Sequence, residues 1–99
     1  MHVRFAWDAV KAAGNIHKHG VSFETAVRVF ADPNALLEQD RIVDGELRWQ
    51  ILGVVEGAVV LMVAHAVYDE DDVEVIRIIS ARKAGRKEIR RYEEANGSL

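Results

Sequence analysis

The 99-residue chain contains no cysteine, a single proline and no uninterrupted apolar segment near the length of a membrane span. Without cysteine it can form neither a disulfide framework nor a thiolate zinc site. An α-helix needs about 20 apolar residues to cross a bilayer, and no segment of that length is present. Residues 1–5 lack the layout of a secretory signal, so we expect a cytoplasmic protein with no membrane association.

The length and the composition predict one globular domain. A chain of 99 residues is too short for two separate cores, so residues 1–99 are expected to form a single domain. Hydrophobic residues make up 49% of the chain, which is too high a fraction for an intrinsically disordered protein.

The net charge of −3 conceals an uneven distribution of charge along the chain. Residues 77–99 contain seven basic and three acidic side chains, whereas residues 1–76 contain six basic and thirteen acidic ones. A local excess of positive charge can bind phosphate even in an acidic protein. A solvated C-terminal helix would explain the same excess without any ligand.

The first third of the chain has the periodicity of two helices. Val3–Trp7 is an extended segment or a short strand, and Asp8 is a suitable N-cap for a helix that runs to about His19. The glycine that follows can end this helix in the left-handed conformation, and Ser22 can cap a second helix. Asp32-Pro33 ends the second helix, because the residue before proline avoids helical backbone angles.

From residue 35 the periodicity changes from helical to strand-like. We expect a short strand at residues 35–38 and further strands over Leu47–Val55, Val59–Val67 and Val73–Ser80. The almost entirely apolar segment Val59–Val67 is predicted to be a central strand. A final helix is expected from Arg82 to about Ala95. Because the connections are short, the predicted fold class is α+β, with two N-terminal helices, an antiparallel sheet of three to four strands and a C-terminal helix.

Polar side chains recur at helical spacing in the first predicted helix. They are Asp8, Lys11, Asn15 and Lys18, and His19 lies beside the last of them. Residues three and four apart share one helix face, so they form a single stripe. The stripe is either a solvated surface without function or a cationic wall that ends in an acid–base group. Histidine titrates near neutral pH, which makes His19 the better candidate for proton transfer.

Arg77 lies in the last predicted strand, where its neighbours on both faces are apolar. Strict alternation places Val75, Arg77 and Ile79 on the same face. An arginine in such surroundings must be ion-paired, extend to solvent or line a site. A structural ion pair with Glu46 or Glu74 and a phosphate-binding role are both consistent with the sequence.

Other arginines form two further groups. Arg48 follows Glu46 by two positions, so a strand would project both side chains to the same face, where they could hold each other. In the predicted last helix, Arg82, Arg86 and Arg90 form a row at four-residue spacing. Like charges at this spacing repel each other, and an anionic ligand would relieve the repulsion. Exposed basic side chains are also common on terminal helices.

The histidines do not indicate a metal site. They are His2, His17, His19 and His65. No pair of them has the spacing of a zinc-binding helix, and no cysteine is available to complete a ligand set. We therefore predict neither a metal nor another cofactor. His65 interrupts an apolar strand and is interpreted as a hydrogen-bonded core residue.

Three groups of motifs follow one another along the chain. The first group consists of Phe5-Ala6-Trp7-Asp8, Lys11-Ala12, Asn15, Lys18-His19-Gly20-Val21-Ser22-Phe23-Glu24 and Asp32-Pro33. The others are Gly45-Glu46-Leu47-Arg48 and Arg77-Ile78-Ile79-Ser80-Ala81-Arg82-Lys83-Ala84, followed by Glu88 and Tyr92. Together they span nearly the whole chain, from Phe5 to about Glu93. In this order they resemble the BrnT family of type II toxin–antitoxin ribonuclease toxins, which are RelE-like.

The resemblance implies a RelE-like α+β fold and an RNA-cleaving activity that inhibits translation and growth. It also implies a BrnA-like antitoxin with a ribbon-helix-helix part that binds DNA. Toxin and antitoxin would form a heterotetramer with two copies of each. Operator DNA would then be bound only through the antitoxin.

The resemblance and the chemistry of RNA cleavage together suggest roles for individual residues. Cleavage without a metal requires an in-line 2′-hydroxyl, a neutralised phosphate and two proton transfers. Arginine suits the phosphate because its planar fork donates two hydrogen bonds. Phosphate stabilisation is assigned to Arg77 and Arg82, and proton transfer to His19. The expected RNA-binding residues are Lys11, Lys18, Arg48, Lys83 and Trp7.

Two aromatic residues and the overall function have alternative interpretations. Trp7 could stack on an RNA base or cover the first helix, and Tyr92 could belong to the site or the core. The chain as a whole could be a non-enzymatic interaction module whose basic end binds an acidic partner or DNA. It could also be a decayed toxin that retains only antitoxin binding. Arg77 favours the enzyme over the module, because a docking surface does not need a cation inside an apolar strand.

Overall fold

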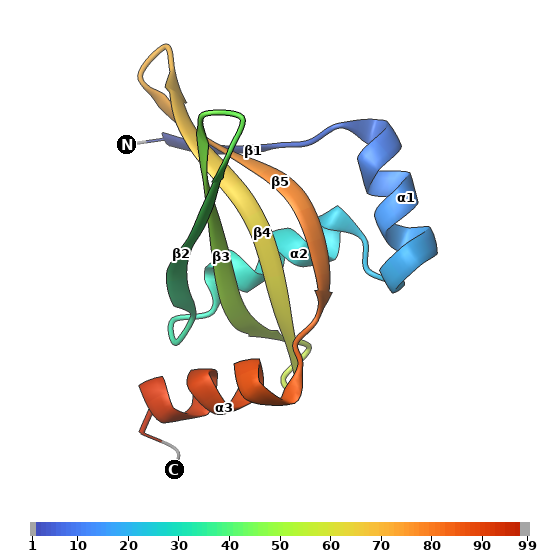
Figure 1. Cartoon of the computed structure of the whole chain (residues 1–99), viewed down its shortest axis with the longest axis vertical. Coiled ribbons are helices and arrows are strands. Elements are labelled where there is room, and N and C mark those ends of the chain that lie inside the picture. Colours follow the sequence, from blue (N-terminus) through green and yellow to red (C-terminus); the bar gives the residue numbers. More distant parts are fainter. Residues whose placement is uncertain (1, 98–99) are drawn as a thin grey trace.

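The structure of the chain is a computed structural model that describes residues 2–97 (Figure 1). Its helices are α1 (Ala9–His19), α2 (Phe23–Val27), the 3-10 helix η1 (Arg28–Ala31) and α3 (Arg86–Ala95). Its strands are β1 (His2–Ala6), β2 (Leu36–Val43), β3 (Glu46–Val55), β4 (Val59–Glu70) and β5 (Val73–Lys83). Within residues 2–97, no helix is both long enough and apolar enough to cross a membrane.

The N-terminal helices begin and end where their capping residues predict. Asp8 caps α1 by accepting hydrogen bonds from two backbone N–H groups of the first turn, and Gly20 ends it with a φ of 71°. Ser22 caps α2 through a backbone N–H of that helix. The second helix changes to the 3-10 helix η1 at Arg28, and η1 ends directly before Asp32-Pro33, as predicted.

The sheet has five strands and is mixed, which corrects the predicted antiparallel sheet of three to four strands. Its order is β1-β5-β4-β3-β2, with β1 parallel to β5 and all other neighbours antiparallel. β4 lies at the centre, as its apolar sequence predicts. The short connections predicted only pairings between consecutive strands, whereas β1 pairs with β5 across most of the chain, for example Phe5 with Ile76.

The strands are also longer than predicted, and the last helix is shorter. β2 reaches Val43 instead of residue 38, and β4 reaches Glu70 instead of Val67. Arg82 pairs with Met62 of β4 and remains extended. α3 begins at Arg86, so the predicted helical row of arginines that starts at Arg82 does not exist.

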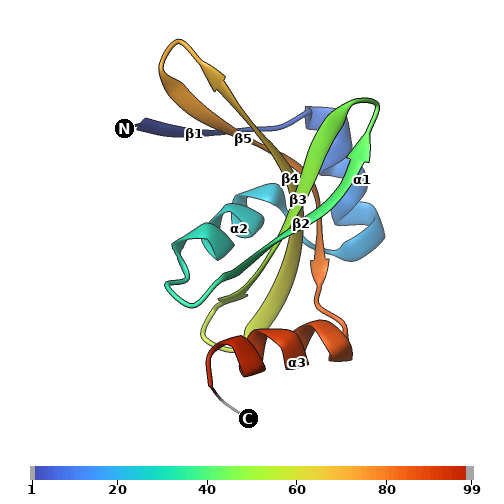
Figure 2. The ribbon, with the colours of Figure 1, turned by 60° about the vertical axis from the view of Figure 1, so that its left-hand side comes forward.

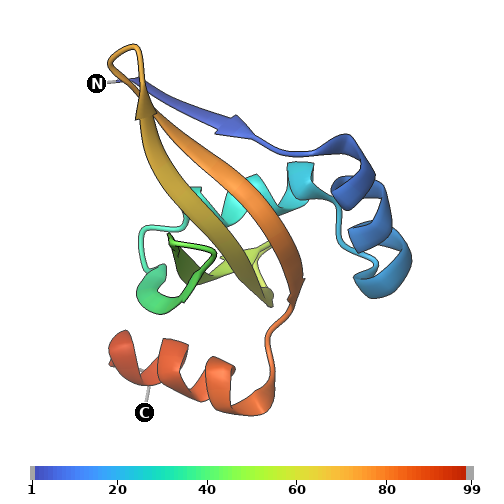
Figure 3. The same cartoon turned by 45° about the horizontal axis from the view of Figure 1, so that its top comes forward.

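The two faces of the sheet are covered differently (Figures 2 and 3). The helix-covered face packs against α2, η1 and part of α1, and its buried residues include Phe23, Val29, Ile51, Val63 and Ile78. The opposite face, which we call the open face, meets α3 at one end through Leu52, Met62 and Tyr92. α3 lies across this end of the sheet and leaves the rest of the open face uncovered by helices (Figure 1).

Gly53 in β3 allows η1 to approach the helix-covered face closely. A Cβ atom at this position would lie 2.7 Å from Cγ1 and 3.1 Å from the carbonyl oxygen of Val29, which is fully buried. A β-branched side chain in the core has little freedom to rotate away. We expect Gly53→Ala to lower the free energy of unfolding by about 1–3 kcal/mol.

Gly14 in α1 provides the matched control, because no atom lies within 4 Å of the position of its Cβ. Gly14→Ala should raise the free energy of unfolding by up to about 1 kcal/mol, since alanine is the better helix former. Urea unfolding measures both variants. The same stability for the two variants would contradict the close approach of η1 to β3.

His65 is a buried core residue, as predicted. Its side chain lies on the helix-covered face and is 2% exposed. Nδ1 forms a hydrogen bond with the carbonyl oxygen of Val63 at 3.2 Å, and the ring packs edge-on against Phe30 with the centroids 4.9 Å apart. Burial lowers the pKa of His65 below its ordinary value of 6.5, because the charged imidazolium loses its hydration there.

This lowered pKa predicts that acid destabilises the fold. Below pH 6.5 the unfolded chain protonates His65 while the folded chain keeps it neutral, so the unfolded state binds more protons. The free energy of unfolding should therefore decrease as the pH falls from about 7 to about 5. Urea unfolding at several pH values should show a smaller decrease for His65→Gln, which retains the three other histidines. Equal decreases in both proteins would contradict the prediction.

Candidate active site

A β-bulge in β5 brings Arg77 and Arg82 to the same face of the sheet. Ile79 lies between Ile78 and Ser80, which pair with consecutive residues of β4, so β5 contains one extra residue at this point. In a regular strand, residues five positions apart project from opposite faces. The extra residue shifts the alternation, and Arg77, Ser80 and Arg82 all project from the open face. The strict alternation expected from the sequence is wrong beyond Ile78.

Arg77 and Arg48 converge on a single carboxylate. Nη2 of Arg77 donates to Oε1 of Glu46 over 2.6 Å, and Nε of Arg48 donates to the same oxygen over 2.9 Å. Glu46 was one of the two partners predicted for Arg77, and its shared face with Arg48 is confirmed. The hydrogen bond from Arg77 holds the pKa of Glu46 below its ordinary value, so the carboxylate is ionised at neutral pH.

Short side chains flank these three residues, which we call the Arg–Glu cluster (Glu46, Arg48 and Arg77). Arg77 pairs across the strands with Ala6 of β1 and Ala66 of β4. β3 pairs with β4 up to Trp49 opposite His65, and continuing this register by one residue brings Arg48 level with Ala66. Neighbouring strands lie about 4.8 Å apart. Because only the small side chain of Ala66 lies between them, the guanidinium groups of Arg48 and Arg77 can come close together on the open face.

The Arg–Glu cluster is accessible and carries an excess of positive charge. The side chains of Arg77 and Glu46 keep 35% and 34% of their surface exposed, which is too much for an ion pair sealed in the core. Two guanidinium groups share one carboxylate, so one positive charge is left unbalanced within the cluster. Each guanidinium has five N–H donors, and within residues 2–97 each uses one of them on Glu46.

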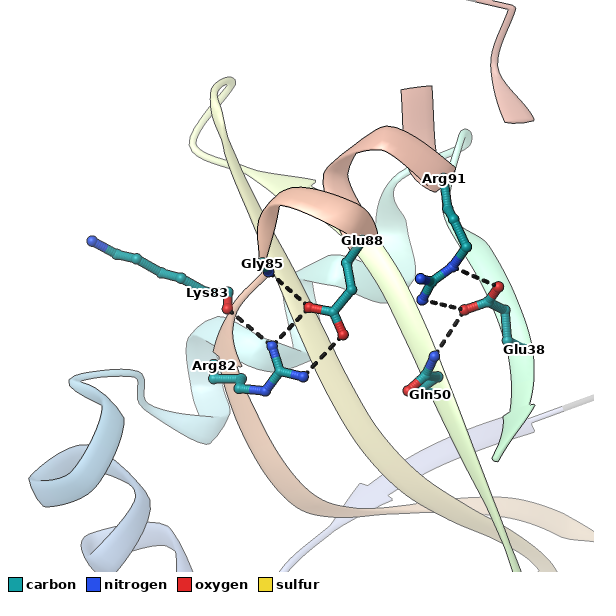
Figure 4. A network of polar contacts seen from close by, with 7 residues as sticks. All are labelled: Glu38, Gln50, Arg82, Lys83, Gly85, Glu88 and Arg91. Carbon is teal, nitrogen blue, oxygen red and sulfur yellow. Dashed lines mark hydrogen bonds and ion pairs between the residues drawn. The ribbon is translucent and has the colours of Figure 1, made fainter. Parts of the chain in front are cut away.

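Arg82 is held by α3 (Figure 4). Its Nη1 and Nη2 donate to the two carboxylate oxygens of Glu88 over 2.7 and 2.9 Å, which is a bidentate ion pair. This contact raises the pKa of Arg82 and lowers the pKa of Glu88. Glu88 also accepts a hydrogen bond from the backbone N–H of Gly85 at the start of α3. An anion that bound Arg82 would therefore compete with Glu88.

Further polar contacts fasten α3 to the open face. Arg91 donates two hydrogen bonds to Glu38, which also accepts one from Gln50 (Figure 4). Tyr92 is 9% exposed and donates to Asp32 over 2.6 Å. Burial and this hydrogen bond raise the pKa of Tyr92 to about 12. These contacts support the core interpretation of Tyr92.

Asn15 is buried, with 7% of its surface exposed, so the polar stripe predicted on α1 is not a continuous exposed surface. Its Nδ2 donates to the carbonyl oxygens of Val21 and Ala81, and its Oδ1 accepts from the N–H of Ala81. β1 pairs with β5 only as far as Arg77, so the Asn15 amide takes the place of a neighbouring strand at Ala81. α1 is thereby attached to the edge of β5 at Ala81, the residue before Arg82.

The remaining predicted cations lie apart from the Arg–Glu cluster. Lys83 points away from Arg82 (Figure 4) and lines a depression of about 440 Å³ near the end of α1. Lys11 and Lys18 are exposed on α1, and His19 is half-buried at its last residue. Within residues 2–97, no hydrogen bond or ion pair joins these four side chains to the Arg–Glu cluster.

Trp7 packs into the helix-covered core. Its ring meets Phe23 edge-on, with the centroids 6.0 Å apart, and the side chain is half-buried.

Glu46 and Glu88 were not among the predicted site residues, although both contact arginines that were. The Glu46-Leu47-Arg48 alternation indicated one of these contacts. The sequence does not indicate the contact between Arg82 and Glu88. It predicts both residues within one helix, whereas Arg82 lies in β5.

Comparisons with known proteins agree with this architecture. The family model that matches residues 7–88 is described as ribonuclease toxin, BrnT, of type II toxin-antitoxin system. The match defines the class of protein as a toxin of a type II toxin–antitoxin system. More particularly, the chain belongs to the BrnT family of ribonuclease toxins, as the three groups of motifs predicted.

A solved structure supports the same fold. The chain is similar to the 1.1 Å crystal structure of the Brucella abortus ribonuclease toxin BrnT, with a TM-score of 0.61 and 21% sequence identity. The similarity covers 87% of this chain and 100% of the Brucella chain. A search of curated proteins finds no match.

Proposed function

We propose that the chain is an endoribonuclease that cleaves RNA without a metal ion and thereby inhibits translation and growth. The supporting observation is the convergence of Arg77 and Arg48 on the accessible Glu46, in a chain of the BrnT family. Guanidinium groups placed here can donate to the oxygens of a phosphate and stabilise the charge of the pentavalent transition state. Arg82, on the same face, contributes to the same phosphate when RNA displaces Glu88.

The cations of α1 and Lys83 have supporting roles in this proposal. Asn15 attaches α1 beside Arg82, so Lys11 and Lys18 extend the basic surface along which the RNA backbone lies. His19, at the last residue of α1, is retained as the proposed proton-transfer group. Lys83 contacts the backbone beyond the edge of the sheet. For Trp7, the contact with Phe23 favours a core role over base stacking.

The antitoxin completes the proposed system. Membership of a type II toxin–antitoxin family implies a protein antitoxin. We propose a BrnA-like partner that binds operator DNA through a ribbon-helix-helix part and forms a heterotetramer with two copies of each chain. The toxin itself then contacts operator DNA only through this partner.

The experiment that tests the function is cleavage of a defined RNA by the purified protein in the presence of EDTA. We expect products with 2′,3′-cyclic phosphate and 5′-hydroxyl ends, and no cleavage where the 2′-hydroxyl at the scissile position is replaced by hydrogen. Loss of activity in EDTA would overturn the metal-independent mechanism. Intact RNA under all conditions would overturn the ribonuclease and favour an interaction module or a decayed toxin.

A further inference from the structure

We propose that Glu46 is the general base that removes the proton from the attacking 2′-hydroxyl of the RNA. The inference rests on the proposed ribonuclease activity. It extends that activity by giving Glu46 a catalytic role in addition to its contacts with two arginines. Three features of the open face support it: an unoccupied carboxylate oxygen, the shared arginines and the accessibility of the side chain.

The two oxygens of Glu46 are used unequally. Arg77 and Arg48 both donate to Oε1, and within residues 2–97 no hydrogen bond reaches Oε2. A carboxylate oxygen has lone pairs that can accept a hydroxyl proton. Since 34% of the side chain is exposed, a hydroxyl group from solvent or substrate can reach it.

The carboxylates near α3 have no such free oxygen. Glu88 uses both oxygens for Arg82 and one of them for the N–H of Gly85. Glu38 uses both oxygens for Arg91 and one of them for Gln50. These two carboxylates are saturated by structural contacts, whereas Glu46 is fixed through one oxygen and open at the other.

The shared arginines place the base beside the phosphate. Arg48 and Arg77 each use one N–H on Glu46 and can offer others to a phosphate, so a bound phosphate would lie next to the Glu46 carboxylate. In RNA the 2′-hydroxyl is adjacent to the scissile phosphate. A base must lie within about 2.6–3.2 Å of the proton that it removes, and the guanidinium contacts hold Glu46 in that region. Its lowered pKa keeps it ionised at neutral pH.

Cleavage by this route is a transesterification of the RNA backbone. The 2′-hydroxyl proton moves to Oε2 of Glu46 while the 2′-oxygen forms a bond to phosphorus. The bond between phosphorus and the 5′-oxygen breaks, and this oxygen takes a proton from water. The products are a 2′,3′-cyclic phosphate and a 5′-hydroxyl. Glu46 then gives its proton to the hydroxide that remains.

Glu46→Gln tests the role, because its amide oxygen still accepts hydrogen bonds from both arginines but the side chain no longer accepts a proton. We expect kcat to fall by about 100- to 10,000-fold. Affinity for an uncleavable RNA with a 2′-deoxy scissile nucleotide should change less than about threefold, because binding depends on the arginines. Glu70→Gln is the matched control, since Glu70 also pairs with an arginine but is exposed on the far end of β4. It should retain full activity.

The pH profile separates a base from a structural partner. The acidic limb of kcat/KM that reports an ionising base should be present in the wild-type protein and absent from Glu46→Gln. Glu46→Asp keeps a carboxylate and should be more active than Glu46→Gln. Cleavage by a folded Glu46→Gln protein within a few-fold of wild type, or lower activity in Glu46→Asp than in Glu46→Gln, would overturn the role of Glu46 and leave the ribonuclease intact. A wild-type protein that does not cleave RNA would overturn both proposals.

Discussion

Replacing Arg77 with alanine is expected to lower the rate of RNA cleavage by about 100- to 1,000-fold, the usual cost of removing one donor to a transition-state oxyanion. Arg77 is a third exposed and contacts Glu46 on the open face. Its loss removes a donor to the phosphate and one of the two contacts that hold Glu46. The initial rate of cleavage of a defined oligoribonucleotide measures the effect. Cells that express the variant should resume growth.

Two further variants serve as controls. One tests whether the planar guanidinium or only its charge is needed, and the other tests whether loss of any exposed arginine lowers activity. Arg77→Lys keeps the charge without the planar fork and should recover only part of the activity. Arg4→Ala removes an exposed arginine that also pairs with a glutamate, and it should remain fully active. Circular dichroism should show that all of these proteins are folded. A folded Arg77→Ala protein that is as toxic as the wild type would remove the Arg–Glu cluster from the mechanism.

Replacing Asn15 with alanine is expected to lower the free energy of unfolding by about 3 kcal/mol, because buried backbone groups lose their partners. Asn15 makes three hydrogen bonds, two of them to the N–H and carbonyl of Ala81 at the open edge of β5. An alanine cannot satisfy either group. Urea unfolding followed by circular dichroism measures the loss.

Asn15→Asp tests whether donation by the amide is essential. A carboxylate cannot donate to the carbonyl oxygens of Val21 and Ala81, so this variant should be at least as unstable as Asn15→Ala. Lys18→Ala on the exposed surface of the same helix should change stability by less than about 0.5 kcal/mol. A loss of less than about 1 kcal/mol for Asn15→Ala would show that the amide does not hold α1 on the sheet.

Several elements could be predicted because their causes are local. The bounds of α1 depend on the Asp8 cap and on the left-handed backbone of Gly20, and both lie at its ends. The central position of β4 follows from an apolar segment that can be buried on both faces. Glu46 and Arg48 share a face because they are two residues apart in a strand.

The candidate site could be predicted only in part. Arg77 stands out in the sequence because a cation in an apolar strand requires an explanation, and Glu46 is one of its two predicted ion-pair partners. The sequence wrongly predicts Arg82 in the last helix, because its basic neighbours continue into α3, whereas β5 extends to Lys83. The bulge at Ile79 then decides that Arg77 and Arg82 share a face. No pattern of apolar and polar residues in β5 marks that insertion.

The amino-acid sequence by itself determined the family, the caps of the first two helices, the central strand and the identity of the unusual arginine. Each of these depends on residues a few positions apart or on motifs that can be matched in order. The tertiary structure alone decided that β1 joins the sheet in parallel, that Asn15 is buried against Ala81 and that Arg77 and Arg48 share one oxygen of Glu46. These features arise from contacts between residues far apart in the chain, which local spacing does not encode.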